Sequence, residues 1–279
     1  MWFFFVKEIS MKKKAILLAA VISLITVGLV HAQEAELTGT IDVTYLSSYI
    51  WRGFDCYAQG HSAIRPSINL DLYGTGFGLK ILSGRAIHGG FEDKEELDIN
   101  LYYNNTFFEA ENYATNYQIG YVYYNFPDNP KKGSPTLMCG DMQELYAALA
   151  WPNICPFGVV PSYTAILMWP SEGKGYARNN GGWAHVFGLD YAWTVPGLLP
   201  ETPEQALNLH AEMVYNDGVG PAGEAVDNDW SHAVFGVSTD FEVVENLTFT
   251  PGFYYQSSWD DSVNSQDEAW VSLAMSYKF

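Results

Sequence analysis

The sequence predicts an all-β protein, a transmembrane antiparallel up-and-down β-barrel of twelve strands. First, from residue 33 onward, segments of about ten residues alternate between apolar and polar side chains, which is the two-residue period of a β-strand. Second, the connections alternate between short and long. Third, the last segment, Asp267–Phe279, is strongly apolar on one face and ends in an aromatic residue. A barrel pairs its last strand with its first, so no edge remains unpaired.

The first six predicted strands follow this alternation, and the third begins after the tight turn at residues 74–76. With examples of their apolar faces, they are Leu37–Arg52 (Ile41, Val43, Tyr45), Ala63–Tyr73 (Ile64, Ile68, Leu70), Phe77–Arg85, Glu96–Phe107 (Leu97, Ile99, Leu101), Tyr113–Tyr124 (Tyr117, Ile119, Tyr121) and Gln143–Trp151 (Leu145, Ala147, Leu149).

The last six predicted strands continue the pattern, the seventh being the least regular. They are Val160–Trp169, Trp183–Thr194 (Phe187, Leu189, Tyr191), Ala206–Tyr215 (Leu207, Leu209, Met213), His232–Val244 (Phe235, Val237, Phe241), Leu247–Gln256 (Phe249, Phe253, Tyr255) and Asp267–Phe279 (Val271, Leu273, Met275). In a bacterial barrel the apolar face meets lipid and the polar face lines the interior.

The lengths of the connections favour a barrel over a soluble sandwich. Compact connections follow most even-numbered strands, with residues 195–205 as the exception, and longer polar or glycine-rich connections follow the odd-numbered strands. Outer-membrane barrels have short periplasmic turns and long external loops. An even strand count then places both chain ends in the periplasm.

The amino end has the pattern of a secretory signal peptide. Residues 11–32 combine a basic start, an apolar run and a small-residue exit, with cleavage expected before Gln33. Residues 1–10 are expected to precede the true start at Met11. We therefore expect residues 1–32 to be an amino-terminal extension and signal peptide that is removed, and residues 33–279 to form the barrel.

The charge balance limits the partners. The chain has a net charge of −18, and losing the four lysines and one glutamate of residues 1–32 changes this to −21. Nucleic-acid binding needs a basic footprint, so no nucleic acid is expected. An acidic surface attracts cations.

The three cysteines fit no zinc spacing, so no metal site is predicted. Cys56 and Cys139 fall in predicted external loops, whereas Cys155 falls in a turn at the opposite end. Disulfide-bonded Cα atoms lie within about 7 Å of each other, so any bridge is expected to join Cys56 to Cys139.

Charged side chains on the polar faces are the candidate functional residues. Rings of carboxylates in a pore favour cations. The alternative is a network of ion pairs that fills a narrow barrel without conducting, because buried charges need partners. The residues predicted to face the interior are Asp42, Arg52, Arg65, Asp71, Lys80, Glu96, Asp98, Glu144, Asp190, His210, Glu212, Asp240, Glu242 and Lys278.

Signals for catalysis are weak. His185, His210 and His232 fall on different strands, and no Gly-x-Ser-x-Gly elbow frames a nucleophile. The sequence therefore predicts no enzyme and no cofactor, although side chains from adjacent strands could still assemble the site of a hydrolase.

Residues 47–53 carry a more specific signal, because Ser47, Tyr49, Trp51, Arg52 and Gly53 match a Ser-x-Tyr-x-Trp-Arg-Gly pattern. This stretch resembles the opening strand of a family of Gram-negative outer-membrane porin-like proteins. In such proteins a carboxy-terminal aromatic residue, here Phe279, serves as a signal to the assembly machinery. Cys56, in the loop that follows, departs from the family pattern.

The resemblance implies an outer-membrane location, the lipid bilayer and the assembly machinery as partners, and passive diffusion of ions or small polar solutes. The excess of inward carboxylates over inward cations predicts a preference for cations. Two alternatives stay open. One is a closed-lumen structural or surface-binding barrel, and the other is an outer-membrane hydrolase. The sequence leaves open which solute passes and whether barrels associate.

Overall fold

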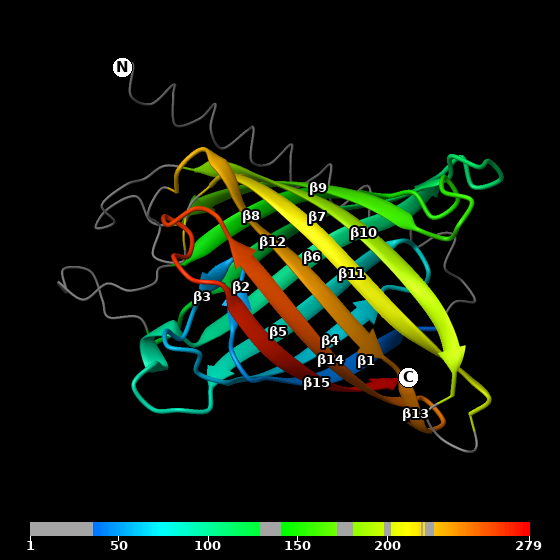
Figure 1. Ribbon diagram of the computed structural model, residues 1–279, viewed down its shortest axis with the longest axis horizontal. Coiled ribbons are helices and arrows are strands. Elements are labelled where there is room, and N and C mark those ends of the chain that lie inside the picture. Colours follow the sequence, from blue (N-terminus) through cyan, green and yellow to red (C-terminus); the bar gives the residue numbers. More distant parts are fainter. Residues whose placement is uncertain (1–35, 129–140, 172–180, 198–201, 219, 221–225) are drawn as a thin grey trace, which may run out of the picture.

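The computed structural model describes residues 36–128, 141–171, 181–197, 202–218, 220 and 226–279 (Figure 1). The predicted signal peptide lies outside these residues. No helix in the described part of the chain is long and apolar enough to cross a membrane. One short 3₁₀ turn, η1 (Glu92–Lys94), lies in a connection between strands.

Twelve antiparallel strands close into a barrel, which confirms the predicted fold class. The first strand pairs with the last, and β12 pairs with β14, so the ring has no open edge. The short β13 continues β12 after a break at Asp240. The strands of the ring are β1 (Thr38–Leu46), β4 (Ala63–Asp71), β5 (Phe77–Ala86), β6 (Glu96–Phe107), β7 (Thr115–Asn125), β8 (Met142–Ala150), β9 (Val160–Pro170), β10 (Gly182–Pro196), β11 (Glu204–Asp217), β12 (Asp229–Thr239) with β13 (Phe241–Val244), β14 (Leu247–Ser258) and β15 (Glu268–Lys278).

The pairing register puts polar side chains inside and apolar side chains outside. In β1, Ile41 and Val43 are 46% and 41% exposed, whereas Asp42 between them faces Ser67 and Ser276 on the neighbouring strands. The same outer face continues around the ring with exposed leucine, isoleucine, phenylalanine and tryptophan side chains. Because closed pairing satisfies the backbone, such a barrel meets the requirement that lipid imposes on a spanning chain.

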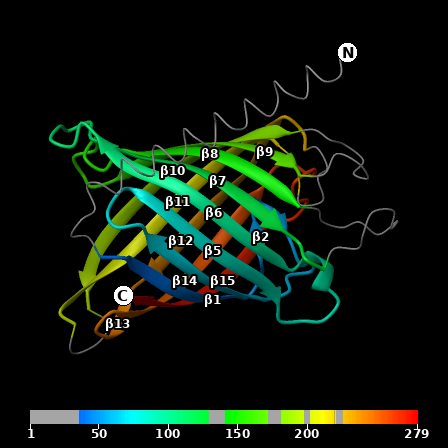
Figure 2. The same cartoon turned by 180° about the vertical axis from the view of Figure 1, so that it is seen from behind.

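The two ends of the barrel differ. The carboxy-terminus and the short connections at residues 72–76, 108–114 and 245–246 lie at one end, which we call the turn end (Figure 1). At the opposite end, the loop end, lie the longer connections, including residues 47–62 after β1 (Figure 2). Phe279 extends the last strand at the turn end, where its backbone exchanges two 3.0 Å hydrogen bonds with Gly39.

The first predicted strand is wrong in its second half. The sequence predicts a strand over Leu37–Arg52, but β1 ends at Leu46. Residues 47–62, which we call the inner loop, then form a hairpin of β2 (Ile50–Trp51) and β3 (Phe54–Asp55) that pairs only with itself among the described strands. Ser47 marks the departure, because its hydroxyl accepts a 2.8 Å hydrogen bond from the backbone N–H of Val271 on β15.

The cysteine prediction stays untested, because Cys139 lies outside the described residues. Cys155 lies in the connection between β8 and β9, at the turn end, and Cys56 lies in the inner loop at the loop end. A bridge between Cys56 and Cys139 therefore stays a prediction.

Candidate functional site

The inner loop carries a tight turn at its tip. Arg52 and Gly53 both have positive φ, +48° and +90°, between the paired residues Trp51 and Phe54. Two positive-φ residues at the centre of a two-residue hairpin are typical of a type I′ turn. Gly53 is also confined, because a Cβ there would lie 2.6 Å from the ring of His232. The Arg-Gly pair of the sequence therefore forms a turn and does not continue a strand.

Aromatic side chains of the inner loop fill the barrel near the loop end. Tyr49, Phe54 and Tyr57 are 1%, 6% and 0% exposed. Trp51 packs against all three buried clusters of the described structure, and its ring meets that of Tyr124 edge-on at 5.6 Å. Burial raises the pKa of the Tyr57 phenol well above its ordinary value. The loop therefore packs its aromatic side chains into a buried core that it shares with the barrel wall.

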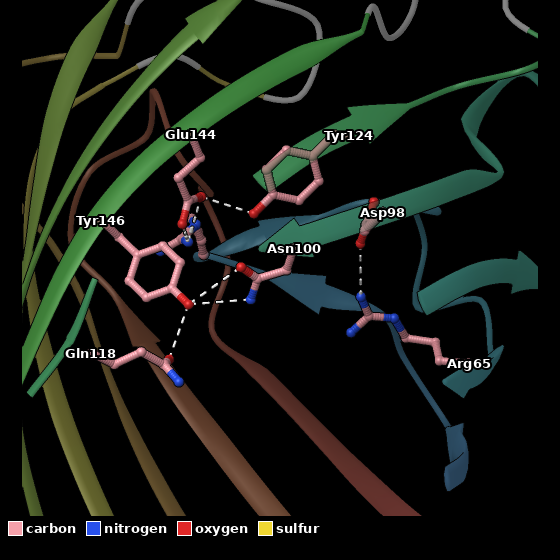
Figure 3. Close-up of polar contacts among 8 residues, drawn as sticks. Arg65, Asp98, Asn100, Gln118, Tyr124, Glu144 and Tyr146 are labelled. Carbon is pink, nitrogen blue, oxygen red and sulfur yellow. Dashed lines mark hydrogen bonds and ion pairs between the residues drawn. The ribbon is translucent and has the colours of Figure 1, made fainter. Parts of the chain in front are cut away.

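The tip of the hairpin is anchored to one wall by an ion pair. The Nη2 of Arg52 donates to both carboxylate oxygens of Glu144 on β8, at 2.7 and 2.6 Å. Glu144 is 2% exposed, and it accepts a further 2.8 Å hydrogen bond from the hydroxyl of Tyr124 (Figure 3). A buried carboxylate needs such partners, so Glu144 and Arg52 depend on each other.

A second ionic group holds the base of the hairpin. The hydroxyl of Tyr49 donates to Glu96 on β6. Arg65 on β4 lies 3.2 Å from Glu96 and 3.7 Å from Asp98, and its guanidinium stacks 4.6 Å from the centre of the Tyr49 ring (Figure 3 shows Arg65 and Asp98). The hydrogen bond to Glu96 and the cation–π contact with Arg65 hold Tyr49, a residue of the inner loop, against β6 and β4.

The opposite wall also holds the hairpin. The side-chain amide of Gln256 on β14 donates a 2.8 Å hydrogen bond to the backbone oxygen of Gly53. In the ring, β14 is five strands from β8, which carries Glu144. The hairpin therefore crosses the lumen and constricts it near the loop end.

Below the constriction lies a cavity of about 500 Å³, which we call the central cavity. Arg52, Arg65 and Lys80 contribute cations to its lining, and Asp98, Glu144 and Glu212 contribute carboxylates. An uncharged hydrogen-bond network completes one wall, where the Tyr146 hydroxyl donates to Gln118 at 2.9 Å and the Asn100 amide donates to Tyr146 at 3.2 Å (Figure 3). The central cavity is therefore polar and charged, as expected for a space that holds water or polar solutes.

The ring of Tyr146 lies flat on the barrel wall because of a glycine. Gly120 on β7 is the direct cross-strand partner of Tyr146, and a Cβ at Gly120 would collide with the Tyr146 ring. Tyr102 and Tyr254 lie against Gly78 and Gly236 in the same way. These glycines let large rings line the wall without projecting across the lumen.

A second cavity, of about 460 Å³, lies beside Asp190, Asn208, His210 and Ser238. His210 Nδ1 lies 2.7 Å from Asp190, and its Nε2 lies 3.5 Å from Glu212. A ring nitrogen must carry a proton to donate to a carboxylate oxygen, so this geometry fits a doubly protonated imidazole. In the described residues, no group of three or more His, Cys, Asp or Glu side chains could hold a metal ion.

One serine–histidine contact also occurs, next to the hairpin. The Ser231 hydroxyl lies 2.8 Å from Nδ1 of His232, but the two residues are 0% and 1% exposed. The pair packs under Gly53 and is closed to substrates, so it does not form a hydrolase site in this structure.

The remaining predicted pore residues lie on the inner face at different heights. Asp42 accepts hydrogen bonds from Ser67 and Ser276. Asp71 accepts from the backbone of Gly74 at the turn end, and Asp240 accepts from Thr250 and Asn208. Glu242 and Lys278 are exposed at the same end. Arg52 alone of the predicted set lies on the inner loop, whereas the others belong to the barrel wall.

Sequence reasoning missed the tyrosines that hold the hairpin or line the central cavity, and the amide that anchors Gly53. Tyr49, Tyr124, Tyr146 and Gln256 carry no charge, so a search for inward charges passes over them. One signal was available: Ser47 occupies the outer, apolar face of the alternation after Tyr45, where the register calls for a lipid-facing side chain. That break indicates the end of the strand.

Comparison with known proteins places the chain in a family. A profile described as "Bacterial protein of unknown function (Gcw_chp)" matches residues 31–245, and the chain belongs to this family. The matched region includes the Ser-x-Tyr-x-Trp-Arg-Gly stretch. No curated protein matches the chain.

Solved structures resemble the barrel with little sequence identity. The NanC porin aligns at 9% identity with a TM-score of 0.51, covering 86% of this chain and 100% of that chain. The KdgM porin aligns at 10% with a TM-score of 0.49, covering 86% and 99%. An outer membrane channel from Pseudomonas putida F1 aligns at 11% with a TM-score of 0.46, covering 88% and 96%. The closed ring and the NanC alignment together give the chain the fold of a bacterial outer-membrane barrel, with its apolar outer face in the lipid.

Proposed function

We propose that this member of the Gcw_chp family is an outer-membrane channel for passive diffusion of ions and small polar solutes, with cations favoured. The observation that carries the proposal is the charged central cavity inside a closed barrel, narrowed by the inner loop. A polar space of about 500 Å³ inside the barrel can hold water and small polar solutes, as a channel requires.

The preference for cations follows from the balance of inward charges. Asp42, Asp71, Asp98, Asp190, Glu212, Asp240 and Glu242 face the interior with Glu96 and Glu144, whereas the opposing cations of the predicted set are Arg52, Arg65, Lys80, Lys278 and the protonated His210. Low-dielectric walls focus this excess of negative charge and enrich mobile cations.

Conductance in planar bilayers tests the proposal. The purified protein, checked for folding by its heat-sensitive migration in gels, should give stepwise currents in KCl. In a salt gradient, the zero-current potential should have the sign of potassium selectivity. Replacing residues 48–61 with a short Gly-Ser linker should raise the conductance, because the linker lacks the side chains that cross the lumen.

A closed-lumen structural or surface-binding barrel is the second candidate. The observation that favours it is the burial of Tyr49, Phe54 and Tyr57, which fill the loop end of the barrel. If the folded wild type is silent and the variant with the linker conducts, the inner loop is a permanent plug, and the closed barrel is the correct assignment. Currents from the wild type would exclude it.

A further inference from the structure

On opposite walls, the central cavity carries a lysine that makes no direct ion pair with the described residues and a glutamate that belongs to a group of net negative charge. Arg52 is neutralised by Glu144, whereas Arg65 lies between two carboxylates, Glu96 and Asp98, which leaves one negative charge on the wall that also carries Lys80. Lys80 on β5 has no ion pair with any described residue. Its direct cross-strand partners on β4 and β6 are the amides Asn69 and Asn100.

The negative counterpart lies on β11. Glu212 lines the same cavity as Lys80, and it shares His210 with Asp190. One imidazolium between two carboxylates leaves this group with a net charge of −1. The group therefore keeps a negative charge toward the cavity after its internal pairing.

The two sites face each other across the lumen. In the ring of twelve strands, β5 and β11 are six strands apart, which is half the circumference. An ammonium without a direct ion pair and a group of net negative charge on opposite walls of one cavity produce a field across the pore axis. Such a field favours a solute that carries a positive and a negative group at separate ends, because each end meets an opposite charge.

We propose that the central cavity is a binding site for small zwitterionic solutes, with the solute carboxylate at Lys80 and the solute ammonium at Glu212. Asn69 and Asn100 flank Lys80, and the aromatic wall of Tyr146 covers the methylene chain between the two charged groups. This inference rests on the proposed channel function and specifies the class of solute that the channel selects.

Calorimetric titration of the detergent-solubilised protein tests the site without requiring conduction. The probes are unbranched ω-amino acids of increasing length, from glycine to 8-aminooctanoate, with hexanoate and hexylamine as analogues that carry one charge. The best ω-amino acid should bind at least about tenfold more tightly than either analogue, which is the scale of one hydrogen bond to a charged group. The affinity is expected to be highest at one chain length of the ω-amino acid, since Lys80 and Glu212 are fixed on the walls.

Variants show where the probe binds. Lys80→Met and Glu212→Gln should each lower the affinity for the best ω-amino acid to that of the single-charge analogues. The double exchange Lys80→Glu with Glu212→Lys should restore binding, because it preserves the opposed pair. Lys278→Met is the matched control, since this inward lysine lies at the turn end outside the cavity, and it should leave binding unchanged.

Equal binding of hexanoate, hexylamine and the ω-amino acids would overturn the inference, as would unchanged binding by folded Lys80→Met. The potassium conductance of the same preparation separates this outcome from failure of the channel itself. A conducting barrel that does not discriminate zwitterions refutes the site alone. A silent barrel that binds them refutes the proposed channel and leaves the site standing.

Discussion

Replacing Arg52 with alanine removes the cation that pairs with Glu144 and releases the tip of the inner loop from the β8 wall. Glu144, 2% exposed, would keep the Tyr124 hydroxyl as a partner but lose its counter-charge. Breaking a buried ion pair by removing one partner costs about 3–5 kcal/mol. The Arg52 side chain is 22% exposed, so we expect the lower end, about 3 kcal/mol.

That energy applies to the docked loop more than to the barrel, whose strands keep their pairing. A cost of about 3 kcal/mol changes the ratio of docked to undocked loop by about a hundredfold. Single-channel recording should therefore show a higher mean conductance for Arg52→Ala, with more frequent transitions between levels. Arg85→Gln is the control, because the Arg85–Glu95 ion pair lies at the loop end with the Arg85 side chain 67% exposed.

Glu144→Gln completes the test. It keeps the size of the side chain and an acceptor for Tyr124 while removing the charge. The double variant Arg52→Ala with Glu144→Gln should show less than the sum of the two single effects, since both act on one contact. A folded Arg52→Ala protein with the wild-type conductance trace would refute the idea that this pair holds the constriction.

Three further predictions concern the turn, the mouth and the last residue. Gly53→Ala should loosen the hairpin and raise the conductance, because its Cβ would collide with the imidazole at 2.6 Å; Gly90→Ala, at a similar φ of +98° with no atom within 4 Å, controls for backbone strain and should not change the current. Neutralising Asp240 and Glu242 should reduce cation selectivity at low salt, and an anion-selective zero-current potential in the wild type would contradict the charge argument. Deleting Phe279 should lower the amount of assembled barrel in the membrane, and normal surface levels would exclude a role in assembly.

The inner loop shows where sequence reasoning reached its limit. The alternation of Ile41, Val43 and Tyr45 against Asp42 predicted β1 correctly, and the same local rule predicted the other strands of the ring. Beyond Leu46 the period of two continues through Tyr49 and Trp51, so an extended segment inside the lumen has the same pattern as a strand in the wall. Periodicity reports which side chains share a face but not what that face contacts.

The sequence by itself determined the barrel, because an apolar outer face and a polar inner face repeat along the strands and need no knowledge of distant residues. It also predicted which charged side chains face inward, since the register follows from the same alternation. The tertiary structure decided how those charges pair. Arg52 and Glu144 are 92 positions apart, and Gly53 and Gln256 are 203 apart, so their contacts depend on closing the ring and folding one loop into it. The same closure left Lys80 without a direct ion pair among the described residues, because its cross-strand partners are the amides Asn69 and Asn100.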